Sequence, residues 1–72
     1  MAKTGKITWY SEAKGNGNIR ADSGEEFFFD LNSLLSRSDQ FQIEVGRKVQ
    51  FEDSGRFLST QNMKKAAQVQ LI

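Results

Sequence analysis

The chain has 72 residues, ten basic and nine acidic side chains, a formal net charge of +1, and neither cysteine nor histidine. This length predicts one domain, residues 1–72, without room for both a core and a deep catalytic cleft. The missing residue types exclude disulfides, cysteine or histidine zinc sites and imidazole catalysis, so we expect no metal, no cofactor and no enzyme activity. The balanced charge excludes tight duplex binding by counterion release alone.

The sequence lacks the features that place a chain in or across a membrane. No apolar run approaches the roughly 20 residues that span a bilayer. Residues 1–6 are not followed by the apolar segment of a signal peptide. We therefore expect a cytoplasmic protein with no membrane partner.

The first half of the chain contains three segments with the composition of strands. Residues 6–10 alternate polar and apolar side chains and are rich in β-formers. Residues 15–20 form a plausible second strand, because glycines within strands often mark a close backbone approach. Residues 26–30 carry consecutive phenylalanines and form the strongest strand by composition. Turn-forming residues, including 22–25, separate these segments.

The second half is more polar, and its segments are less regular. Residues 31–35 fit one short helical turn, and residues 36–42 read as a polar loop. Residues 47–52 and 68–72 alternate again and predict a fourth and a fifth strand. Residues 57–67 fit either a helix or strand and loop. Five short strands separated by turns favour a small barrel or sandwich over a βαβ unit.

Four segments carry a resemblance to a known family. Residues 4–19 contain T-G-K-I-T-W-Y and K-G-N-G-N-I, and closely resemble the opening of bacterial cold-shock proteins, T-G-x-V-K-W-F followed by K-G-F-G-F-I. Residues 26–34 are similar to the family's D-V-F-V-H-F-x-x-I motif, residues 45–51 to E-G-Q-x-V-x-F, and residues 66–69 to A-A-x-x-V. The resemblance spans nearly the whole chain. It implies one cold-shock-like domain: an all-β, five-stranded antiparallel oligonucleotide/oligosaccharide-binding (OB) barrel, with a monomer as the default state.

The departures from the family pattern fall on its functional face. Asn16 and Asn18 stand where the family has the two phenylalanines of K-G-F-G-F. Asp30 and Leu31 replace the histidine and the phenylalanine of the second motif, and Thr8 replaces the lysine before the tryptophan. The chain thus resembles a nucleic-acid-binding scaffold that lacks part of its stacking chemistry.

Single-strand binding combines exposed rings that stack on bases with a positive groove that follows the phosphates. By the resemblance, Phe28 points outward and Phe27 and Phe29 point inward. We expect glycines 15 and 17 to keep their strand flat so that bases can approach the rings, and Arg20 to add positive charge. The predicted nucleic-acid-binding residues are Lys6, Trp9, Tyr10, Lys14, Asn16, Asn18, Phe28, Asp30 and Lys64, with Lys65 near the same face.

Loss of two stacking rings weakens binding by about 2–6 kcal/mol if both contribute fully. Asp30 adds a negative charge that opposes phosphate, whereas the asparagines can hydrogen-bond base edges. We therefore predict weak, low-specificity binding of single-stranded RNA or DNA through Trp9 and Phe28, as an RNA chaperone or transcript-binding regulator. The alternative is a barrel re-purposed for protein interaction, with Trp9, Tyr10 and Phe28 as an apolar patch. Phe41 either anchors its loop on the barrel, which we favour, or offers an extra ring.

Overall fold

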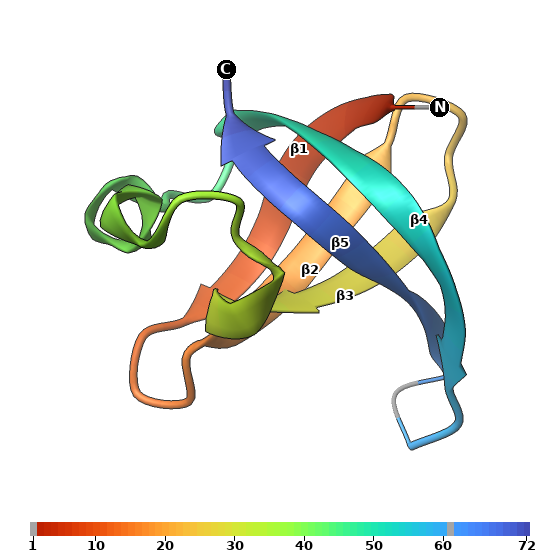
Figure 1. Ribbon diagram of the computed structural model, residues 1–72. Coiled ribbons are helices and arrows are strands. Elements are labelled where there is room, and N and C mark those ends of the chain that lie inside the picture. Colours follow the sequence, from red (N-terminus) through yellow and green to blue (C-terminus); the bar gives the residue numbers. More distant parts are fainter. Residues whose placement is uncertain (1, 61) are drawn as a thin grey trace.

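The computed structural model describes residues 2–60 and 62–72, and it contains five strands and two short 3₁₀ helices. Figure 1 shows the strands crossing one another around a common interior, with both helices on the connection between β3 and β4. All five strand predictions are confirmed, although β1, β4 and β5 are longer than predicted. The bounds are β1 (Lys3–Ser11), β2 (Asn16–Ala21), β3 (Glu26–Asp30), η1 (Leu31–Ser33), η2 (Arg37–Gln42), β4 (Lys48–Leu58) and β5 (Met63–Leu71).

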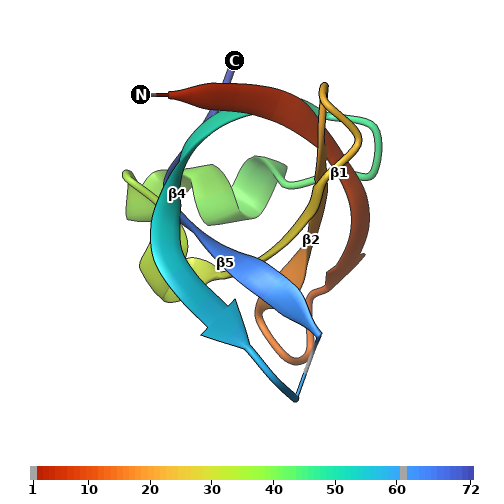
Figure 2. The ribbon, with the colours of Figure 1, turned by 90° about the vertical axis from the view of Figure 1, so that its right-hand side faces the viewer.

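The strands close into a barrel in the order β1-β2-β3-β5-β4, and Figure 2 shows them curving around a ring. Strand β1 pairs antiparallel with both β2 and β4, β2 pairs antiparallel with β3, and β4 with β5. The remaining pair, β3 with β5, is parallel, so the sheet is antiparallel everywhere except where these two strands meet. The predicted all-β, five-stranded OB barrel is confirmed.

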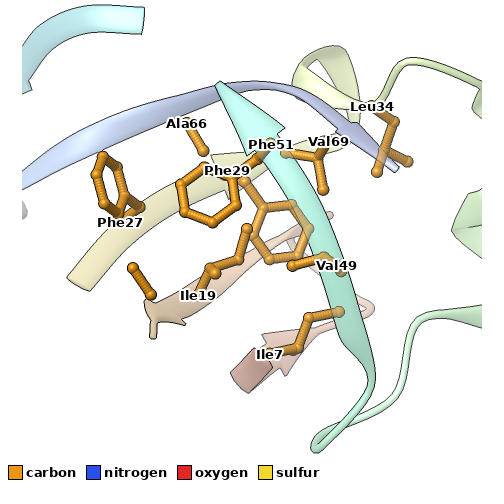
Figure 3. Close-up of a cluster of buried hydrophobic side chains, with 10 residues drawn as sticks. Ile7, Ile19, Phe27, Phe29, Leu34, Val49, Phe51, Ala66 and Val69 are labelled. Atoms are coloured by element: carbon orange, nitrogen blue, oxygen red, sulfur yellow. The ribbon is translucent and has the colours of Figure 1, made fainter. Parts of the chain in front are cut away.

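Alternation along the strands fills the barrel with apolar side chains, as Figure 3 shows. Phe27 and Phe29 are fully buried, as predicted, and Phe27 meets Phe51 edge-on at a centroid distance of 4.9 Å. Because successive strand side chains point to opposite faces, Phe28 points outward between them. The buried apolar core comprises Ile7, Ile19, Ala21, Phe27, Phe29, Leu34, Val49, Phe51, Ala66 and Val69.

The structure corrects two local expectations. The helical reading of residues 57–67 is wrong, because β4 continues to Leu58 and β5 begins at Met63, with the two strands paired as a hairpin. The polar loop predicted over residues 36–42 is instead the 3₁₀ helix η2. The helical turn predicted over residues 31–35 is confirmed as η1.

Candidate nucleic-acid interface

Trp9 owes its outward position to a β-bulge. Ile7 lies opposite Ile19 on β2, but Trp9 lies opposite Asn18, so Thr8 is an extra residue on β1. In a regular strand Trp9 would point inward with Ile7, because residues two apart share a face. The bulge reverses this. The indole of Trp9 is 47% exposed, whereas Ile7 is 1% exposed.

Trp9 and Phe28 lie on the same outward face, in one row of paired residues. Trp9 on β1 is opposite Asn18 on β2, and Asn18 is opposite Phe28 on β3. Phe28 is in turn opposite Lys65 on β5. Phe28 is only half-buried, although its neighbours Phe27 and Phe29 are buried. We call these four residues (Trp9, Asn18, Phe28 and Lys65) the stacking row.

Tyr10 lies on the other side of the sheet from Trp9. It packs against the core, and its ring stacks on Phe29 with a centroid distance of 6.1 Å and an interplanar angle of 11°. Burial raises the pKa of the Tyr10 phenol, and the nearby charge of Glu12 raises it further. The structure therefore separates Tyr10 from the face that carries Trp9 and Phe28.

The structure places the two glycines differently from each other, and only Gly17 lies in a strand. Gly15 lies in the turn before β2 rather than in the strand, at φ +70°. Gly17 is buried and faces the interior, opposite both Tyr10 and Phe29. A Cβ on Gly17 would overlap the Trp9 carbonyl oxygen and lie 3.1 Å from Phe29 Cε1. The missing side chain of Gly17 lets the β1 backbone and the Phe29 ring approach β2 closely on the inner face of the barrel.

Asp30 lies in a second outward row, opposite Asn16, which is opposite Ser11. Its Oδ1 accepts hydrogen bonds from the Ser33 backbone N–H at 3.0 Å and the Ser33 hydroxyl at 3.1 Å, which caps η1. Its Oδ2 lies 3.6 Å from the Lys65 Nζ. Asp30 thus caps η1 and pairs with Lys65. The positive charge of Lys65 offsets the negative charge of Asp30, which weakens the expected repulsion of phosphate.

Of the two consecutive lysines on β5, Lys65 rather than Lys64 lies beside Phe28. Lys64 is opposite Phe27, and its Nζ donates a hydrogen bond to Glu25 Oε2 at 2.9 Å. That hydrogen bond and the opposite charge raise the pKa of Lys64 and lower the pKa of Glu25. Sequence reasoning assigned Lys64 to the site and gave Lys65 only a general position, because the pairing of β5 with β3 is a tertiary feature.

The remaining predicted residues are surface residues of β1, β2, η2 and the turn between β1 and β2. Lys6 is exposed on β1, and Lys14 is exposed in the turn between β1 and β2. Asn16 and Asn18 both point outward, because the buried Gly17 lies between them. Phe41 on η2 is 84% exposed, so the expectation that it anchors its segment on the barrel is wrong.

Residues 2–60 and 62–72 contain neither a candidate membrane-spanning helix nor a candidate metal-binding cluster. No helix there has the length and apolar character needed to span a membrane. No group of three or more acidic, cysteine or histidine residues is placed to hold a metal ion.

The chain is similar in sequence to several cold shock-like proteins, although no protein-family model matches it. It is 37% identical over 49 residues to cold shock-like protein CspA of Stigmatella aurantiaca, which covers 68% of this chain and 72% of that protein. It is 35% identical over 51 residues to CspD of Bacillus cereus, which covers 69% and 74%. The match to CspE of Bacillus anthracis is 31% over 68 residues and covers 90% and 98%. The chain therefore belongs to the family of cold shock-like proteins.

Proposed function

We propose that this protein binds single-stranded RNA or DNA weakly and with low sequence specificity, by stacking bases on Trp9 and Phe28. It would act without catalysis, as a monomeric cytoplasmic RNA chaperone or transcript-binding regulator. The observation that carries the proposal is the stacking row, where the two rings share an outward face with only Asn18 between them. Membership of the cold shock-like family and the OB barrel support the same reading.

The physical basis is base stacking without base selection. Every base has a π-face, so an exposed ring contributes about 1–3 kcal/mol per base whatever the sequence. Of the three predicted rings, Trp9 and Phe28 point outward from β1 and β3, whereas Tyr10 packs against the core. Binding that depends on two rings is weak.

The asparagines add hydrogen-bonding capacity to this surface. Asn18 lies between the two rings, and Asn16 lies one row away, between Ser11 and Asp30. An amide carries both donors and an acceptor, and it can hydrogen-bond the exposed edge of an unpaired base or a phosphate oxygen. These contacts replace part of the stacking that the family phenylalanines would supply at these positions.

Fluorescence of Trp9 tests the proposal directly, because it is the chain's single tryptophan. Titration with a pyrimidine-rich oligonucleotide of about eight nucleotides at low salt should quench it, since one OB fold covers about 4–16 nucleotides. Phe28→Ala should weaken binding by about 5- to 150-fold, which corresponds to the loss of one stacked base. Phe57→Ala is the matched control, because Phe57 is 60% exposed and lies on β4 outside the stacking row.

Salt dependence separates this function from the protein-interaction alternative. Binding to a polyanion weakens steeply with salt, whereas binding through an apolar patch does not. Lys14→Glu should weaken oligonucleotide binding and leave an apolar interface nearly unchanged. Absence of quenching at high micromolar oligonucleotide and low salt would count against nucleic-acid binding.

A further inference from the structure

Three cationic side chains lie in a line across three neighbouring strands. Lys6 on β1 is directly opposite Arg20 on β2 and directly opposite Lys48 on β4. All three are exposed. We call these three residues the basic strip. Lys6 and Arg20 could be predicted from the sequence as sources of positive charge, but Lys48 could not, because only the pairing of β1 with β4 places it beside Lys6.

This arrangement is unfavourable for the folded chain by itself. Like charges directly opposite each other on paired strands destabilise a sheet. The ion pairs found among the described residues use other lysines: Lys3 and Lys64 with Glu25, and Lys65 with Asp30. The positive charge of the strip is therefore available to a ligand.

The strip lies on the same face as the stacking row. Arg20 is two residues from Asn18 on β2, and both point outward on either side of the buried Ile19. Two residues along a strand correspond to about 7 Å. The base of one nucleotide can therefore lie on the stacking row while its phosphate lies on the basic strip. Glu26, opposite Arg20 on β3, ends the positive line on that side.

We propose that the basic strip binds the phosphodiester backbone of the same single strand whose bases lie on the stacking row. This inference rests on the proposed function and adds the path of the ligand to it. The backbone crosses β4, β1 and β2 over Lys48, Lys6 and Arg20. At β3 it leaves the strip, because Glu26 repels phosphate there. The strip thus contacts the nucleotides near Trp9 rather than those near Phe28.

The test compares two double variants of equal charge. Lys6→Gln/Lys48→Gln removes two cations from the strip, and Arg37→Gln/Arg56→Gln removes two exposed cations from η2 and the far part of β4. The probes are an oligothymidylate of about eight nucleotides and the same oligonucleotide with an uncharged methylphosphonate backbone, followed by Trp9 quenching. Urea unfolding of each variant checks that it is folded, and Lys6→Arg/Lys48→Arg restores the charge.

For the phosphodiester probe, the plot of log affinity against log salt should be less steep for the strip variant than for the wild type, by about 1.4. The reason is that two phosphate contacts are lost and each contributes about 0.7 for a single strand. Over a tenfold rise in salt this is about a 25-fold difference from the wild type. The control pair and the arginine variant should keep the wild-type slope, and the uncharged probe should not distinguish the strip variant from the wild type. Wild-type quenching with an unchanged slope in the strip variant would overturn the strip alone. No quenching of the wild type by either probe would overturn the proposed function itself.

Discussion

Tyr10 packs against the core of the barrel and stacks on Phe29, with 6.1 Å between the ring centroids, whereas the preceding residue Trp9 points outward. Gly17 on β2 lies opposite both Tyr10 and Phe29, and a Cβ there would lie 3.0 Å from Tyr10 Cα and 3.1 Å from Phe29 Cε1. Of the two consecutive aromatic residues, Trp9 is therefore exposed on the surface and Tyr10 packs against the core.

The inward position of Tyr10 predicts a specific pH dependence of stability. Burial raises the pKa of its phenol above the ordinary value of 10.0, so the folded state favours the neutral form. The neutral phenol therefore contributes to the free energy of unfolding fully below pH 10, and this contribution is lost as pH rises through the higher pKa of the folded state. Tyr10→Phe should therefore lose less stability than the wild type between about pH 9 and 11 in urea unfolding. Because Tyr10 is the only tyrosine, tyrosinate absorbance reports its ionisation directly, and identical pH profiles for the two proteins would contradict the prediction.

Placing a ring at position 18 should strengthen binding. Asn18 lies between Trp9 and Phe28, so Asn18→Phe would give the stacking row a third ring and raise oligonucleotide affinity by about 5- to 150-fold. Asn16→Phe is the positional control, because its neighbours in register are Ser11 and Asp30, and the gain there should be smaller. Titration of Trp9 fluorescence measures both. Equal affinity of Asn18→Phe and the wild type would show that the face does not stack bases.

The strands could be predicted because alternation and composition are local signals. Phe27 and Phe29 lie inside and Phe28 outside, as the alternation requires. The bulge at Thr8 has no such signal, and from alternation alone Trp9 would share the inward face of Ile7. The prediction that Trp9 is exposed therefore rests on the family resemblance and not on the periodicity of the strand.

The other differences arise where tertiary pairing decides the outcome. A shift of one residue in register exchanges the two faces of a strand. The sequence of β5 cannot show whether Lys64 or Lys65 lies beside Phe28, because that depends on its parallel pairing with β3. Lys48 joins Lys6 and Arg20 for the same reason. The helix η2 is polar over most of its length and exposes its one large apolar side chain, Phe41. It therefore has no amphipathic pattern from which a helix could be predicted.

Gly17→Ala should destabilise the barrel by about 1–3 kcal/mol, because the added methyl group is forced into the packed interior. It would overlap the Trp9 carbonyl oxygen and press on Tyr10 Cα at 3.0 Å. Asn18→Ala is the control on the same strand, since its side chain points outward, and it should change stability by less than about 0.5 kcal/mol. Urea unfolding measures both variants. Wild-type stability of Gly17→Ala would mean that the interior can accept the methyl group.

Phe41→Ala should leave stability within about 0.5 kcal/mol of the wild type, because the side chain is 84% exposed. The contrasting variant is Phe51→Ala, which empties a fully buried position and should cost about 3–5 kcal/mol. Thermal or urea unfolding distinguishes them. A large loss for Phe41→Ala would restore the anchoring role that the exposure argues against.

Asp30 combines a structural and an electrostatic role, and two substitutions separate them. Asp30→Ala removes the oxygen that accepts from Ser33, so it should destabilise the protein by about 1 kcal/mol, as loss of a helix N-cap does. Asp30→Asn keeps an oxygen that can cap η1 but removes the charge beside Lys65. Since Lys65 is then free to meet phosphate, Asp30→Asn should bind an oligonucleotide more tightly than the wild type at low salt, with nearly unchanged stability. Urea unfolding and Trp9 titration measure the two effects independently. Weaker binding of a stably folded Asp30→Asn would show that the carboxylate itself contacts the ligand.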